Sequence, residues 1–190
     1  MQIGVFGRPI AGERASGDHA AFVHVDDGVS FAVCDGLGHG AAARVSSSLA
    51  VRAFYKHLTE PSDHILDAVH GAVTGTRGTV MAAVHARGGA VEAAVAGNIT
   101  VQLVAPREER RFGGLSCVLG ARGPLRLRPP ESLPLAAGDV IVAFTDGIGS
   151  RTSIKEDLAV LREHPIVIAQ RMIERHGNDD DALVLVAKLG

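Results

Sequence analysis

The chain of 190 residues is long enough to bury a hydrophobic core as one domain, with no need of disulfides or a structural metal. Its net charge of −2, with acids and bases interspersed, excludes the basic stripe that is typical of nucleic-acid-binding proteins. Apolar residues make up 46% of the chain and aromatic residues only 4%, so small aliphatic side chains must build the core.

The N-terminal segment and the two cysteines bear on the compartment. Residues 1–19 show no basic region followed by a long apolar stretch, as a signal peptide would. No segment approaches the roughly 18 uninterrupted apolar residues that a membrane span needs. Cys34 and Cys117 are too few for a disulfide framework, which favours a reducing compartment. We therefore expect a soluble cytoplasmic protein with a single domain over residues 1–190.

The first elements in chain order are predicted to be a hairpin and two helices. Residues 20–28 alternate in polarity and end in a turn signal, and residues 29–35 continue as an apolar strand. Residues 40–59 place apolar side chains on one helical face. A second helix is expected from Ser62, with Ser62 as its N-cap, to about Val73.

From residue 78 the pattern changes to short strands. The connections between them are too short for crossover helices, which predicts an antiparallel meander. The run of mixed charge at 107–111 is interpreted as a solvated hairpin tip. The predicted strands of this region cover residues 78–87, 90–98, 99–105 and 115–120.

The last third of the chain holds three predicted elements. Residues 138–147 form a buried strand that ends in an acid and a glycine, a helix covers about 164–176, and residues 182–189 form the last strand. Strands thus come in adjacent runs, with helices inserted between them. This order predicts an α+β fold with antiparallel sheets, because a regular βαβ alternation is missing.

Four aspartates stand where predicted strands begin or end: Asp18, Asp35, Asp146 and Asp180. A carboxylate packed against apolar strands is costly to bury unless it is paired or binds a cation. Mg²⁺ and Mn²⁺ prefer oxygen ligands, so strand ends from two sheets could bring these acids together around two ions. The glycines after Asp35 and Asp146 allow the sharp turns that this needs. For each acid taken alone, a solvated turn is the alternative.

Two motifs also suggest other enzyme classes. Residues 36–41, GLGHGA, match the glycine pattern of a dinucleotide-binding turn. That site needs a parallel strand ending in an acid about 20 residues further on, where residues 55–60 instead form the end of a predicted helix. Residues 17–19, GDH, hint at a calcineurin-like metallophosphoesterase. Its several histidine ligands are not matched, because the nine histidines fall mostly within predicted strands and helices.

Six short motifs in order resemble the metal-dependent protein phosphatase family (PPM, type 2C-like). Within it, they are most similar to the bacterial branch that contains the sporulation phosphatase SpoIIE and the stressosome phosphatase RsbX, and the length is closest to that of RsbX. Each motif is weak alone, but six in register cover nearly the whole chain. They are SGD at 16–18, DGLGHG at 35–40, GT at 78–79, AGN at 96–98, TDG at 145–147 and DDDA at 179–182.

The resemblance implies an α-β-β-α sandwich of two antiparallel sheets flanked by helices, with two Mn²⁺ or Mg²⁺ ions at one edge. Asp35 matches the acid that bridges both ions, and Gly36 matches the residue whose carbonyl is a ligand. Asp146 and Asp180 match the acids that hold one ion. Asp18 matches the acid that binds metal or metal-held water. Together with Asp35 and Asp146, Asp18 makes up the implied catalytic set.

The last acidic motif leaves its ligand open. Asp181 corresponds to the Asn or Asp beside the family's last ligand, so it is a supporting residue in this alignment. Because three acids run together, the choice among Asp179, Asp180 and Asp181 stays open by one position. Leu183 stands where the family more often has Thr or Ser.

Two further positions are assigned beside the acids. His39 is a candidate donor of a proton to the leaving alkoxide, and the alternative is a polar loop residue near the site. The Gly97-Asn98 turn is interpreted as structural support. No arginine near the N-terminus matches the phosphate clamp of eukaryotic members.

The resemblance also implies the reaction. A metal-bridging hydroxide would attack phosphoserine or phosphothreonine directly, with no covalent enzyme intermediate. The implied substrate is a phosphorylated STAS-domain protein, either a stressosome scaffold protein or an anti-anti-sigma factor, within stress-response signalling. Substrate recognition is expected on the surface of residues 113–133 and 148–165. The alternative is a catalytically silent domain of the same fold that only binds phosphoprotein.

Overall fold

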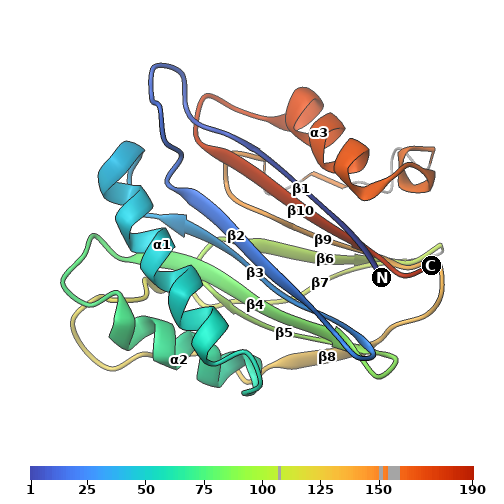
Figure 1. Ribbon diagram of the computed structural model, residues 1–190, viewed down its shortest axis with the longest axis horizontal. Coiled ribbons are helices and arrows are strands. Elements are labelled where there is room, and N and C mark those ends of the chain that lie inside the picture. The colour runs from blue at the N-terminus through green and yellow to red at the C-terminus, as the bar shows by residue number, and fades with distance from the viewer. Residues whose placement is uncertain (107, 150–151, 154–158) are drawn as a thin grey trace.

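The computed structural model describes residues 1–106, 108–149, 152–153 and 159–190. Two five-stranded sheets pack face to face, and helices cover their outer faces (Figure 1). The strand orders are β1-β10-β9-β6-β7 and β2-β3-β4-β5-β8, and all neighbours are antiparallel. The fold is therefore an α-β-β-α sandwich, as predicted, and it excludes the parallel sheet of a dinucleotide-binding domain.

Each of the two sheets is assembled from separated parts of the chain. In the first sheet the strands are β1 (Gln2–Arg8), β6 (Thr100–Val104), β7 (Glu109–Arg111), β9 (Val140–Phe144) and β10 (Ala182–Lys188). In the second they are β2 (Asp18–Val25), β3 (Gly28–Gly36), β4 (Thr79–Arg87), β5 (Ala90–Ala96) and β8 (Glu131–Pro134). The described helices are α1 (Gly40–Lys56), α2 (Ser62–Ala72), α3 (Pro165–His176) and the short 3₁₀ helix η2 (Val160–Arg162).

The central strands consist mainly of apolar residues because both of their faces are buried. In β3, Phe31 and Val33 face the core between the two sheets, whereas Ala32 and Cys34 face α1 and α2. In the same way β10 divides its residues between the inter-sheet core and the cluster under α3. Both cysteines are free, as expected.

The predicted meander is wrong, because β5 and β6 belong to different sheets. Val95 of β5 and Val101 of β6 both point into the inter-sheet core, so the two strands face each other across it. Residues 115–120 are not a strand either. They are held only by isolated bridges from Leu115 to Ala96 and from Leu119 to Thr79.

The N-cap of α2 is also corrected. Pro61 occupies the cap position, and Ser62 is the first helical residue. The Ser62 hydroxyl donates a hydrogen bond of 2.8 Å to Oε1 of Glu92 on β5, and the Ser62 amide donates one of 3.1 Å to the same oxygen. A carboxylate from the sheet thus satisfies the helix terminus in place of a local cap.

Three edge strands escaped prediction. β1 is interrupted by Gly4 and Gly7, yet it pairs with β10 over its whole length. β8 is short and lies on the edge beside β5. The mixed-charge run contributes residues 109–111 to β7, Glu108 directly precedes that strand, and residue 107 lies outside the described residues.

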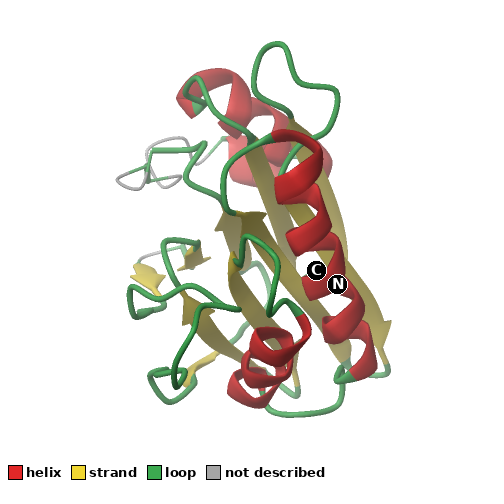
Figure 2. Cartoon of the chain, turned by 90° about the vertical axis from the view of Figure 1, so that its left-hand side faces the viewer, coloured by secondary structure: helices red, strands yellow, loops and turns green. Residues whose placement is uncertain are grey.

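The strand ends that carry the four aspartates meet at one end of the sandwich. β2 and β10 begin there, and β3 and β9 end there, on the left of Figure 1. Figure 2 looks onto this end, where loops connect the two layers. Antiparallel pairing brings the start of one strand beside the end of its neighbour, and this places the acids together.

Candidate metal centre

Four strand-end aspartates line one cavity of about 530 Å³: Asp18, Asp35, Asp146 and Asp180. Asp181, His39 and Asn98 line the same cavity. Among the predicted residues, Gly36 is not part of the lining, although its neighbours Leu37 and Gly38 are. The structure therefore gathers side chains that are up to 163 positions apart in the sequence.

Asp18 and Asp35 lie directly opposite each other on β2 and β3. Asp18 is only 2% exposed, and its Oδ2 accepts a hydrogen bond of 2.7 Å from the Thr145 hydroxyl. Burial raises the pKa of Asp18 well above its ordinary value, and the charge of Asp35 raises it further. Burial likewise raises the pKa of Asp35, as do the charges of Asp146 and Asp180. The carboxylates thus repel one another in a poorly solvated place.

Asp146 is held from two sides in the loop after β9. Its Oδ2 accepts a hydrogen bond of 2.8 Å from the Asn98 amide, and its backbone carbonyl accepts one of 2.9 Å from the Asn178 side chain. Gly147 lies so close to the chain at Asp181 that a Cβ there would overlap the Asp181 carbonyl oxygen. Only glycine lets these two loops approach this closely.

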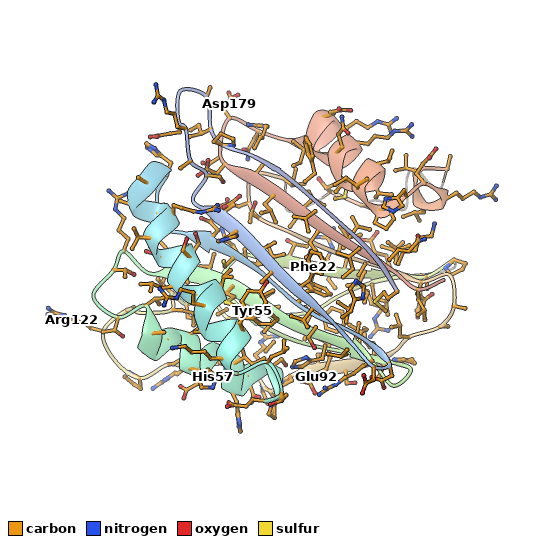
Figure 3. The ribbon with its side chains drawn as sticks, in the orientation of Figure 1. Phe22, Tyr55, His57, Glu92, Arg122 and Asp179 are labelled. Atoms are coloured by element: carbon orange, nitrogen blue, oxygen red, sulfur yellow. The ribbon has the colours of Figure 1, made fainter. Side chains whose placement is uncertain are left out.

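The three consecutive acids take three different positions. Asp181 is buried, and its two carboxylate oxygens accept backbone hydrogen bonds of 2.7 Å each, one from Ile10 and one from Gly17. Asp180 has one oxygen without a partner among the described residues, where only its Oδ1 accepts a bond, of 2.8 Å, from the Asp181 amide. Asp179 is exposed at the outer edge (Figure 3) and does not line the cavity. This geometry favours Asp180 as the ligand and Asp181 as an anchor of the N-terminal loop.

Several neighbours that the sequence reasoning did not single out hold the acids in place. The Thr145 hydroxyl orients Asp18, and the Thr79 hydroxyl donates a bond of 2.6 Å to the backbone carbonyl of Asp35. Arg44 donates a bond of 3.0 Å to the carbonyl of Asp18. Arg8 donates bonds to the carbonyls of the 178–180 loop. Thr145 and Thr79 belong to the TDG and GT motifs, which is the one signal that could have identified them.

His39 lies at the rim of the cavity, at the N-terminus of α1. Its Nδ1 is 2.9 Å from Oε1 of Glu13, and the imidazole is largely exposed. A carboxylate that engages one ring nitrogen sets the orientation of the ring and leaves the other nitrogen available. The structure thus gives His39 a partner that the sequence did not indicate.

The donor chemistry of the cavity suits hard divalent cations. Its ionisable lining is mainly carboxylate, and the raised pKa values of Asp18 and Asp35 reflect an excess of negative charge that cations would relieve. Among the described residues, no group of three or more His, Cys, Asp or Glu side chains is arranged to enclose an ion. Mg²⁺ sites need only one or two carboxylates per ion and keep several waters, so the residues fit such ions.

Comparison with known proteins agrees with the family that the sequence motifs resemble. The sequence model of the family described as stage II sporulation protein E (SpoIIE) matches residues 25–190. A structure from work on the bacterial stressosome, described as a modular system adapted to control secondary messenger signalling, is 27% identical, with 98% of both chains covered and a TM-score of 0.90. No curated protein sequence matches the chain.

Two further solved structures share the fold at lower identity. RsbX in complex with magnesium is 20% identical, with 98% of this chain and 94% of that chain covered and a TM-score of 0.85. The serine/threonine phosphatase PstP of Mycobacterium tuberculosis is 18% identical, with 99% and 98% covered and a TM-score of 0.75. In the part of the chain that the structure describes, every helix is too short or too polar to cross a membrane.

Proposed function

The chain belongs to the SpoIIE family of PPM serine/threonine phosphatases, and on this premise we propose that it is a metal-dependent hydrolase of phosphoserine and phosphothreonine in proteins. The observation that carries the proposal is the meeting of four strand-end aspartates in one cavity. Burying these like charges together is unfavourable because the carboxylates repel one another. Bound divalent cations would relieve that repulsion, which favours their binding.

The proposed ligands combine the family resemblance with the side chains that line the cavity. Asp35, Asp146 and Asp180 would hold two Mn²⁺ or Mg²⁺ ions, with Asp18 supporting the bound ions or their water and the Gly36 carbonyl as a further ligand. When bound, two such ions supply positive charge to the phosphoryl oxygens and lower the pKa of water toward neutrality. RsbX with magnesium and a PstP structure with two manganese ions support this choice of metals.

The remaining parts of the cavity position these groups. Asn98 donates a hydrogen bond to one oxygen of Asp146 and so fixes the orientation of this carboxylate. Asp181 holds the N-terminal loop through Ile10 and Gly17. His39, oriented by Glu13, is our candidate for the group that donates a proton to the leaving oxygen of the serine or threonine.

For the substrate we propose a phosphorylated STAS-domain protein, namely a stressosome scaffold protein or an anti-anti-sigma factor. The likeness to a structure from work on the bacterial stressosome and to RsbX supports this class. We further propose that residues 1–190 act as one domain in the cytoplasm, in stress-response signal transduction.

The test is hydrolysis of p-nitrophenyl phosphate with and without Mn²⁺, in wild type, Asp146→Asn and the control Asp27→Asn. Asp27 lies in the exposed turn between β2 and β3, so its variant makes the same change of charge far from the cavity. We expect turnover that needs Mn²⁺, is lost in Asp146→Asn and is kept in the control. Calorimetric titration with Mn²⁺ reports binding independently of turnover. Binding of Mn²⁺ without turnover would favour the silent phosphoprotein-binding domain. The absence of both Mn²⁺ binding and turnover would refute the metal centre.

A further inference from the structure

A second cavity, of about 550 Å³, lies beside the carboxylate cavity and shares a wall with it. Ser116, Cys117 and Val118 line both cavities, and we call these three residues the shared ridge. A bound peptide that places one side chain in the carboxylate cavity and continues over the shared ridge would therefore enter the second cavity.

The shared ridge is fixed at both of its ends by backbone hydrogen bonds to the second sheet. The Gly97 amide donates a bond of 2.8 Å to the carbonyl of Leu115. Leu119 and Thr79 exchange two bonds of 2.8 and 3.1 Å. These bonds join the shared ridge to β4 and to the end of β5. The position of the two cavities relative to each other is therefore fixed.

The loop on the far side of the second cavity is held against α2. The Gly120 amide donates a bond of 3.1 Å to Nδ1 of His70, which also lines this cavity. Gly120 has a φ of 85°, a conformation that glycine adopts without strain, and a Cβ there would lie 2.8 Å from the carbonyl oxygen of Val73. The loop is thus formed in advance, so that a ligand would not have to order it.

The two cavities differ in charge. Four aspartates and Asp181 line the first, whereas no carboxylate is among the described residues that line the second. Arg122 and Arg126 lie in the wall of the second cavity, beside apolar groups of Leu115, Pro124 and Leu125. Both arginines are exposed, and Figure 3 shows Arg122 at the outer edge of the molecule.

Neither guanidinium is neutralised by a residue that the structure describes. Within the described residues, Arg122 and Arg126 form no hydrogen bond or ion pair. Two cations over a preformed, partly apolar groove are complementary to an extended chain with acidic side chains, since a guanidinium can bind a carboxylate through two parallel hydrogen bonds.

We propose that the second cavity binds an acidic stretch of the substrate phosphoprotein a few residues from its phosphorylated serine or threonine, with Arg122 and Arg126 as the residues that recognise it. The proposal rests on the phosphatase function proposed above and adds a sequence preference to it. An extended chain advances about 3.3 Å per residue, so a few residues lead from the first cavity across the shared ridge.

The experiment compares fluorescein-labelled peptides that carry a non-hydrolysable phosphonate analogue of phosphoserine, with either glutamates or glutamines at the second to fourth positions on both sides of the analogue. Fluorescence anisotropy in Mn²⁺ gives the ratio of the two dissociation constants for wild type, Arg122→Glu, Arg126→Glu and Arg52→Glu. Arg52, on the exposed face of α1, lines neither cavity and makes the matched change of charge.

We expect wild type and Arg52→Glu to prefer the glutamate peptide by about three- to tenfold, as exposed charge pairs allow. Arg122→Glu and Arg126→Glu should each remove or reverse that preference. Equal affinities in wild type, or an unchanged ratio in both variants, would overturn the proposal. Turnover of p-nitrophenyl phosphate without a charge preference refutes this inference alone, whereas a charge preference without turnover refutes only the phosphatase function.

Discussion

Replacing Gly147 by alanine should displace the loop of Asp146 from the loop of Asp180 and Asp181. A Cβ at this position would overlap the Asp181 carbonyl oxygen and lie 2.7 and 2.8 Å from Cα and Cβ of Ala182. All three atoms belong to the backbone or to the start of a side chain, so no flexible end can move aside. Residue 147 has no positive φ, and the strain is therefore purely steric.

The magnitude follows from these contacts. Carbon atoms pack at about 3.5–4.0 Å, so the loops must separate by at least about 0.8 Å even at Ala182. Overpacking of this kind costs about 1–3 kcal/mol, which lowers the melting temperature by roughly 2–12 °C in a chain of this size. A misplacement of about 1 Å near reacting groups costs about a hundredfold in rate, so we expect a loss of ten- to a hundredfold in turnover.

The assay is thermal unfolding with and without Mn²⁺, together with hydrolysis of p-nitrophenyl phosphate. Gly149→Ala is the matched control in the same loop, because among the described residues a Cβ there would meet only the Thr152 hydroxyl at 3.6 Å, an ordinary contact. Gly147→Ala should unfold at a lower temperature and gain less stability from Mn²⁺ than the control. If the two variants match each other in stability and turnover, the close approach of the two loops does not hold the site together.

Three further predictions concern single side chains. Asn98→Ala removes the hydrogen bond to Asp146 and should weaken Mn²⁺ binding by about ten- to a hundredfold in calorimetric titration, while unchanged affinity would remove Asn98 from the site. Asp35→Asn removes one of the buried like charges and should raise the melting temperature of the metal-free protein; a lower one would contradict the repulsion. Burial lowers the pKa of His85 in the folded protein below 6.5. Neutral His85 therefore makes its full contribution to the free energy of unfolding above pH 6.5, and this contribution is lost as the pH falls from 6.5 toward the pKa of His85 in the folded protein. The free energy of unfolding in urea at pH 5.5 and 7.5 should show a smaller acid loss in His85→Gln than in wild type, and an equal loss would refute this.

Much of the fold could be predicted because the apolar pattern is local. The strand containing Phe31 and the strand containing Leu185 are buried on both faces, and such strands are apolar along their length in the sequence itself. Edge strands were missed because half of their surface is exposed or, as at Gly4, because a glycine takes the place of an apolar side chain. The pairing of β6 with β9 instead of β5 depends on two sheets closing over one core, which no short segment encodes.

The candidate site divides in the same way. By itself, the sequence determined that aspartates stand at strand ends followed by glycines, since apolar strands and turn residues are written into neighbouring positions. Only the tertiary structure decided which acids share a cavity and which oxygens stay free. Asp181 is an anchor because the amides of Ile10 and Gly17 reach it from 171 and 164 positions away, and such bonds form only when β1, β2 and β10 have packed. A hydrogen bond engages a carboxylate oxygen whether its donor is near or distant in the sequence. The distinction between Asp180 as the candidate ligand and Asp181 as the anchor therefore depended on long-range packing and not on local pattern.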